Sequence, residues 1–278
     1  MIERFSEDID LVLDWKLIGF GKKLKDPMQE FDSKSKQDQF NKEINRQAAV
    51  YIAETLCPEL DILLANEGIG LTAMLDPDDP HVVNIRYPAA FAEAYIRPEV
   101  RLEIGPLASW VPSANHLIRP YAFDVVPQAF LNPACEVVAI AAERTFWEKA
   151  TILHQEAHRT SPMPPRYSRH YYDLYKLAVS KVRKSALSNT AMLRDVVAFK
   201  KRFYPSARAR YDLAIPGSFR LLPATAALTK RLEHDYREMQ VMLFGSPPDF
   251  HAILQGLKAL ETEINSLGAP RPARPSLR

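Results

Sequence analysis

The sequence predicts an α+β fold in which a strand-rich front half is followed by a helical back half. Before about Val138, short segments alternate apolar and polar residues, which is the two-residue period of a half-buried strand. After that point, apolar residues recur every three or four positions, as they do on one face of a helix. The 278 residues are enough for two ordinary domains. We therefore expect one domain over residues 1–138 and a helical domain over residues 139–266.

The front half shows the patterns of several strands and one long helix. "EDIDLVLD" at 7–14 alternates apolar and acidic residues, and "GLTAMLD" and "HVVNIRY" flank the turn "PDDP", which predicts a hairpin. "EVRLEIG" at 99–105 and "NHLIRPYAFDV" at 115–125 predict two further strands. Between the first strand and the hairpin, residues 36–56 have an apolar helical face that includes Phe40, Ile44 and Ala48.

The back half shows helical spacing from residue 141 to residue 266. We expect helices over residues 141–159, 168–180, 186–202, 224–243 and 249–266, with Ser168 as the N-cap of the second. The remaining residues 267–278 are rich in proline and basic residues, and we expect them to form a disordered tail.

The bulk composition limits the class of protein. Hydrophobic residues make up 47% of the chain and charged residues 25%, which is typical of soluble globular proteins. Its two cysteines indicate neither a disulfide scaffold nor a metal site. The N-terminus is charged, without the apolar segment of a signal peptide, and no apolar run is long enough to span a bilayer. We expect a cytoplasmic protein without a membrane partner.

The net charge of +2 conceals a strongly basic segment. From Arg159 to Arg210 the chain has 13 Lys and Arg residues against two acids, a local net charge of +11. Such a segment favours a polyanionic partner, RNA or DNA first, although a solvated helical face is the simpler explanation. The interleaved tyrosines suit unpaired bases but also a helical core. Candidate RNA-binding residues are Arg166, Arg169, Lys181, Arg183 and Lys184.

Three carboxylates could meet on one face of the predicted sheet. Side chains two residues apart on a strand point the same way, so Asp8 and Asp10 share a face, opposite Ile9 and Leu11. If the strand at 99–105 is a neighbour, Glu103 completes a trio. Three carboxylates suit Mg²⁺ (or Mn²⁺), which supports phosphoryl chemistry. Two acids alternating on a strand are weak evidence alone, because exposed strands often alternate in this way.

Two charged residues of the back half stand among large apolar residues. Lys149 follows an aromatic pair in "RTFWEKATIL", and Asp173 lies among tyrosines in "RHYYDLY". A lone lysine or aspartate on a helix usually lies on the surface. The apolar neighbours favour a functional position for these two.

Three motifs in this order resemble a known family. "RFSEDIDL", "RTFWEKATILH" and "SRHYYDLYKL", together with the late stretch "EHDYREMQVMLFGSPPDFHAIL", resemble the nucleotidyltransferase toxins of the AbiEii/AbiGii type, from abortive-infection and toxin–antitoxin systems. The resemblance covers residues 4 to about 266. It implies a polymerase-β-like nucleotidyltransferase core with a mixed sheet, followed by a helical C-terminal domain. It also implies a Mg²⁺-dependent transfer of a nucleoside monophosphate from an NTP to an acceptor, which in the family can be the 3′ end of tRNA.

The resemblance also implies roles for particular residues. Asp8 and Asp10 would bind metal, Ser6 and Lys149 would bind the nucleotide, and Asp173 would be the active-site acid of the second domain. Glu103, as third catalytic carboxylate and metal ligand, rests on the strand argument above. The usual partner of such a protein is a cognate antitoxin encoded alongside it.

The chain departs from the family pattern at its start. Family members normally carry a glycine turn on a helix before the acidic strand, whereas only three residues precede Arg4 here, so we expect this element to be missing. This departure leaves open a catalytically degenerate relative that acts as an antitoxin-binding protein. The sequence also fits a metal-dependent nuclease or a transferase for a small-molecule acceptor.

Overall fold

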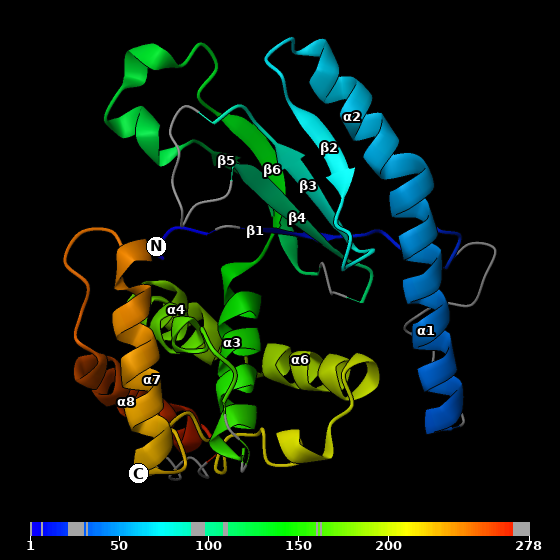
Figure 1. The fold of residues 1–278 in the computed structure, drawn as a ribbon. Coiled ribbons are helices and arrows are strands. Elements are labelled where there is room, and N and C mark those ends of the chain that lie inside the picture. The colour runs from blue at the N-terminus through cyan, green and yellow to red at the C-terminus, as the bar shows by residue number, and fades with distance from the viewer. Residues whose placement is uncertain are drawn as a thin grey trace, which may run out of the picture. The chain divides into compact units, whose positions relative to one another are not determined.

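A computed structural model describes residues 2–6, 8–21, 31, 33–89, 98–107, 111–159, 161 and 163–268 (Figure 1). The contacts divide the chain into two compact units. The sheet unit is Ser6–Ser109, and the helical unit consists of Met1–Phe5 and Trp110–Arg278. This division does not test the domain boundary expected at residue 138, which stays a prediction. Most of the expected disordered tail, residues 269–278, lies outside the described residues.

The sheet unit is built on a mixed four-stranded sheet. Its strands are β1 (Asp8–Val12), β2 (Thr72–Leu75), β3 (Val82–Arg86) and β4 (Glu99–Gly105), and their order is β1-β4-β3-β2. β1 runs parallel to β4, whereas the other two pairs are antiparallel. The hairpin predicted around "PDDP" is therefore present as β2 and β3, and the predicted mixed α+β class is confirmed.

One long helical segment packs on the sheet unit's apolar face. α1 (Lys34–Tyr51) begins after Ser33, whose side chain accepts a hydrogen bond from the backbone N–H of Lys36. A π-helical turn (η1, Ile52–Leu56) then continues into α2 (Cys57–Asn66), which packs beside β2 (Figure 1). The helix thus extends ten residues beyond the predicted end. The π turn ends two residues before Pro58, a residue that cannot donate a backbone hydrogen bond.

The alternation of residues along β4 separates an apolar face from a polar face. Leu102 and Ile104 are buried in the core with Val83 of β3 and Ala48 of α1. Ile9 and Leu11 of β1 lie on the same face as Leu102 and Ile104 but remain 48% and 39% exposed, because β1 is an edge strand. The other face of the sheet carries the acidic residues.

The helical unit begins with a two-stranded hairpin. β5 (Ser113–Ile118) pairs antiparallel with β6 (Cys135–Ile140), and the short 3₁₀ turns η2 (Tyr121–Asp124) and η3 (Pro127–Ala129) lie between them. The strand expected at 115–125 is therefore shorter, and it ends before Pro120, which cannot donate a ladder hydrogen bond. The strand β6 lies partly where the helical region was expected to begin, because the apolar run "VVAI" does not distinguish strand from helix.

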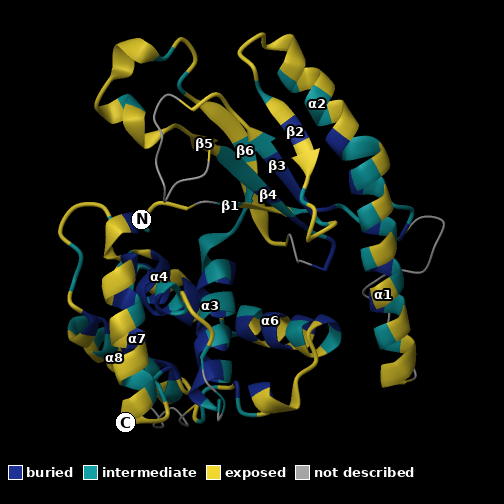
Figure 2. Ribbon diagram, in the orientation of Figure 1, coloured by how far each residue is buried: buried dark blue, intermediate teal, exposed yellow. Residues whose placement is uncertain are grey.

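Among the described residues, six α-helices complete the helical unit. They are α3 (Ala142–Ala157), α4 (Ser168–Ala178), α5 (Val182–Ser188), α6 (Thr190–Phe203), α7 (Ala226–Met239) and α8 (Phe250–Ser266). α3 packs against α4, α5 and α6. The buried residues of this core include Trp147, Leu153, Tyr171 and Leu257. Figure 1 labels α3, α4 and α6, and Figure 2 shows buried positions on α3 and α4 in dark blue. The predicted helices are present, with the region 182–203 divided between α5 and α6.

The start of α4 differs from the prediction. Ser168 is the first residue of α4 rather than its N-cap, and its hydroxyl donates to the sulfur of Met239. The backbone N–H of Ser168 instead donates to the Asp235 carboxylate at 2.8 Å. An aspartate on α7 thus caps α4 from another part of the chain, a contact that no local pattern predicts.

Candidate active site

The structure brings the three predicted carboxylates together on the polar face of the sheet. Because β1 and β4 are parallel neighbours, Asp10 lies directly opposite Glu103, and Asp8 lies two residues before Asp10 on the same face. Carboxylate oxygens of the three residues all lie within 4.8 Å of one another. Asp10 is exposed, and Asp8 and Glu103 are half-buried. The geometry suits a hard cation that takes oxygen ligands and keeps water molecules.

Ser6 lies at the approach to this trio. Its hydroxyl donates to an Oδ of Asp8 at 2.8 Å, and the same Oγ lies 3.2 Å from the Asp8 backbone carbonyl oxygen. The hydrogen bond from Ser6 restricts the rotation of the Asp8 carboxylate. The residue expected to bind nucleotide is therefore also placed to orient one of the expected metal ligands.

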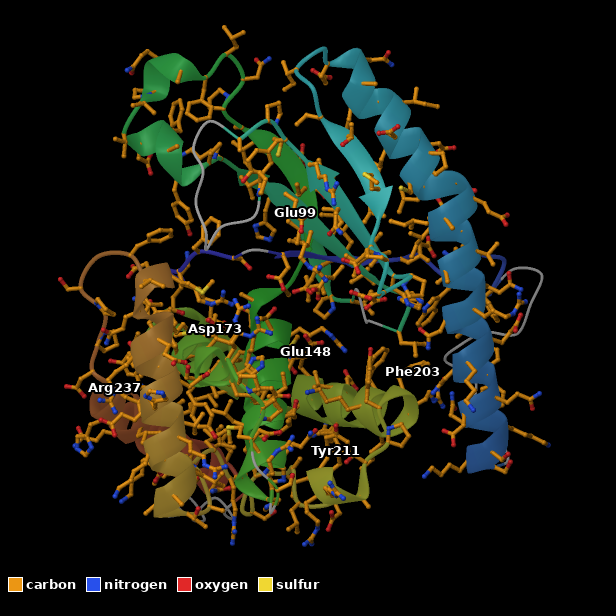
Figure 3. All side chains as sticks on the ribbon, viewed as in Figure 1. Glu99, Glu148, Asp173, Phe203, Tyr211 and Arg237 are labelled. Carbon is orange, nitrogen blue, oxygen red and sulfur yellow. The ribbon has the colours of Figure 1, made fainter. Side chains whose placement is uncertain are left out.

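The helical unit holds a second charged group, centred on Asp173 (labelled in Figure 3). Asp173 of α4 is fully buried, and its Oδ2 accepts a hydrogen bond from Nζ of Lys149 of α3 at 3.0 Å. Arg4 donates Nε and Nη2 to the two carboxylate oxygens at 2.8 and 3.0 Å. This two-pronged pairing is the geometry in which arginine binds a carboxylate most strongly.

Arg4 is a residue of this group to which the sequence assigned no role. A short backbone pairing holds it in place, because Arg4 forms a β-bridge with Leu243 and the N–H of Phe5 donates to the Met242 carbonyl at 2.7 Å. Glu3 adds an ion pair with Lys176 at 2.8 Å. Sequence reasoning could not find this contact, because Arg4 and Asp173 lie 169 residues apart. The only local signal for a role of Arg4 was its position inside the motif "RFSEDIDL".

The surroundings of Asp173 keep it charged. Burial opposes ionisation, but the hydrogen bond from Arg4 and the positive charge of Lys149 together lower its pKa below the usual value. His170 has its pKa lowered to about 3 by burial and by the nearby Lys149, so its imidazole is neutral at pH 7. Its Nδ1 lies 3.4 Å from Nζ of Lys149. Lys149 is therefore a fixed ammonium group between two acceptors, with its side chain still 21% exposed.

Four of the five candidate RNA-binding residues are exposed, and the fifth, Arg169, is half-buried on α4. Lys181, Arg183 and Lys184 are exposed at the start of α5, where Arg183 forms an ion pair with Glu263. Arg166 is exposed in the turn before α4. Tyr171 and Tyr172 of the basic segment, and Tyr211 directly after it, are buried in the helical core, which supports the simpler explanation of those tyrosines.

His154 of α3 is a residue of the helical core. His154 is fully buried, and its Nδ1 accepts a hydrogen bond from the backbone N–H of Arg220 while its Nε2 pairs with the carbonyl of Arg210 at 3.1 Å. Burial lowers its pKa to about 4, so the ring is neutral.

In the part of the chain that the structure describes, the trio Asp8, Asp10 and Glu103 is the only cluster found with the composition and spacing of a metal site.

Comparison with known proteins identifies the family. A family model described as "Nucleotidyl transferase AbiEii toxin, Type IV TA system" matches residues 1–256. The chain belongs to this family. Searches of curated proteins and of solved structures each found no match.

Membership of the AbiEii family gives the carboxylates and the lysine a chemical context. The family is one of nucleotidyltransferase toxins, which implies an NTP substrate, and the type IV toxin–antitoxin system implies a cognate antitoxin. The acidic trio offers the donor set that a divalent metal needs. None of the helices among the described residues is long and apolar enough to cross a membrane.

Proposed function

We propose that this AbiEii protein transfers a nucleoside monophosphate from an NTP to an RNA acceptor, the 3′ end of tRNA, with Mg²⁺ or Mn²⁺ as the metal. The observation that carries the proposal is the convergence of Asp8, Asp10 and Glu103 on one sheet face, in a chain of a nucleotidyltransferase family. We place the protein in the cytoplasm, with an antitoxin encoded beside its gene.

Asp8, Asp10 and Glu103 are the proposed metal ligands. Three carboxylates supply enough negative charge to hold a divalent cation and leave coordination positions for phosphate oxygens and water. Such a cation, when bound, lowers the cost of the negative charge that develops at the transferred phosphoryl group. Ser6 orients the Asp8 carboxylate through its hydroxyl.

Lys149 is the proposed phosphate-binding residue. An ammonium held by Asp173 and His170 keeps one N–H for a further acceptor, since it has three donors in total. Asp173 acts through Lys149, because the carboxylate is fully buried and is already occupied by two cations. Arg4 satisfies the oxygen that Lys149 does not bind.

The proposal of an RNA acceptor rests on charge. The segment Arg159–Arg210 has a net charge of +11, and Lys181 and Lys184 are exposed. Exposed basic residues of this kind bind phosphates without reading the sequence. Arg166, Arg169 and Arg183 are the other proposed contacts.

Product size tests the proposed reaction. The protein is incubated with total tRNA and each α-labelled NTP in turn, with Mg²⁺, and the RNA is separated on a denaturing gel. Transfer yields labelled RNA that is longer than the starting material. Unlabelled, shortened RNA would indicate the nuclease instead, and unchanged RNA without label would indicate a degenerate binding protein or a small-molecule acceptor.

A further inference from the structure

The polar face of the sheet carries a permanent positive charge beside the acidic trio. Arg101 lies on β4, directly opposite Asp8 in register and two residues before Glu103. Its side chain is 28% exposed, and its Nη2 lies 3.8 Å from an Oε of Glu103. An arginine at the edge of a metal site could repel the cation, or it could hold one of the ligands in place.

Arg101 is itself anchored on its other side. Its Nη1 donates to Oδ2 of Asp76 at 2.9 Å, and the side-chain amide of Asn84 donates to the same oxygen at 3.0 Å. Asn84 faces Arg101 across the β3–β4 pair, and Asp76 follows directly after β2, so Arg101 and Asn84 reach the same carboxylate from two neighbouring strands.

Asp76 is fixed in turn by the hairpin loop that follows β2. Its Oδ1 accepts hydrogen bonds from the backbone N–H groups of Asp78 and Asp79 at 3.0 and 3.2 Å. The hydrogen bond from Asn84 and those backbone groups lower the pKa of Asp76 to about 2, so it is charged at neutral pH. The loop "DPDDP" therefore provides a rigid anion for the guanidinium group.

We propose that Arg101 is a positioning residue for the metal ligand Glu103, held in place by Asp76 and Asn84. The planar guanidinium donates a hydrogen bond to Asp76 through Nη1 and places Nη2 at ion-pair distance from Glu103, which a lysine ammonium cannot do in the same fixed geometry. Partners that orient a metal ligand typically change metal affinity about 10- to 100-fold when they are removed. This inference rests on the proposed metal site and adds residues to it.

The direction in which Mn²⁺ affinity changes when Arg101 is replaced separates a positioning role from simple repulsion of the cation. Mn²⁺ binding to the metal-free protein is measured by titration calorimetry for the wild type, Arg101→Met and Arg101→Lys. Positioning predicts that both variants bind Mn²⁺ about ten-fold more weakly. Repulsion predicts the opposite, with tighter binding for Arg101→Met, where the charge is lost, and unchanged binding for Arg101→Lys.

The control variant is Arg86→Met. Arg86 lies on the same face of the sheet and pairs with Glu99 (labelled in Figure 3) at 3.7 Å. This substitution removes one positive charge from the face without removing a contact to Glu103, and we expect it to leave Mn²⁺ affinity within about two-fold. Thermal unfolding of each variant verifies that the sheet is intact.

Two outcomes overturn different claims. If the wild type binds Mn²⁺ and Arg101→Met binds it equally well or more tightly, the positioning role is wrong while the proposed metal site stands. If the wild type binds no Mn²⁺, or if Asp10→Asn binds it as the wild type does, the metal site itself is wrong and the inference fails with it.

Discussion

Nζ of Lys149 lies 3.0 Å from Oδ2 of Asp173, a carboxylate with no exposed surface. The two residues come from neighbouring helices, α3 and α4, and are 24 positions apart in the chain. Because Arg4 binds the same carboxylate, two cations depend on one buried anion. The stability of the helical unit and the proposed nucleotide site are thus linked through Asp173.

Replacing Asp173 tests this link through stability. Asp173→Asn removes the charge that compensates Arg4 and Lys149, and we expect the free energy of unfolding to fall by about 3 kcal/mol. The measurement is urea denaturation followed by circular dichroism. Asp212→Asn is the matched control, because Asp212 pairs with Arg210 on the surface, where solvent screening leaves an ion pair little effect on stability. If both variants lost the same free energy of unfolding, Asp173 would not be the anion on which Arg4 and Lys149 depend.

Replacing Lys149 tests nucleotide binding. Lys149→Ala removes the ammonium proposed to bind NTP phosphates, and we expect NTP affinity to fall roughly ten-fold or more. The measurement is equilibrium titration with each NTP. Lys176→Ala is the control, since Lys176 is similarly half-buried and pairs with Glu3. An NTP affinity for Lys149→Ala that equals that of the control would remove Lys149 from the site.

The buried histidines predict a loss of stability in acid. The folded protein keeps His154 and His170 neutral, with pKa values lowered to about 4 and about 3, whereas the unfolded chain titrates near the ordinary value of about 6.5. Below about pH 6.5 the unfolded state binds protons first, so this stability is present at pH 7 and is lost as the pH falls toward 4. For His154 alone the loss amounts to roughly 3 kcal/mol.

A variant isolates this contribution from that of the carboxylates. His154→Gln removes the titrating ring, so the free energy of unfolding should depend less steeply on pH between 6.5 and 4 than it does in the wild type. Urea denaturation at several pH values in this range provides the comparison. An identical pH dependence in the two proteins would show that His154 does not carry the effect.

The sequence predicted the acidic trio because strands have a fixed period. Once Asp8 and Asp10 lie on β1, their shared face follows, and only the pairing of β1 with β4 was needed to add Glu103. That pairing joins residues more than 90 positions apart, and no local pattern predicts it. Glu103 was therefore predicted to join the trio only if β1 and β4 proved to be neighbours. The family resemblance supplied the roles, which the strand pattern alone could not.

Contacts between distant segments account for what the sequence did not reveal. Arg4 binds Asp173 only because the N-terminal segment pairs with Leu243, and Arg101 reaches Asp76 only because β4 pairs with β3 of the hairpin. The start of α4 depends on Asp235 in the same way. Helix positions followed from local periodicity, whereas β6 was missed because a short apolar run fits both a strand and a helix.

Asp10→Ala gives the most direct test of the central claim, that Asp8, Asp10 and Glu103 form a metal-dependent nucleotidyl transfer site. Label transfer from α-labelled NTPs to tRNA is measured for the wild type, Asp10→Ala and the control Asp78→Ala, an exposed acid of the hairpin loop. We predict that Asp10→Ala loses label transfer, because the substitution removes a metal ligand. Its thermal unfolding midpoint should be unchanged or higher, because the substitution also relieves the repulsion among the three acids. The Asp78→Ala control should transfer label as the wild type does. Transfer by Asp10→Ala at the wild-type rate would contradict the claim.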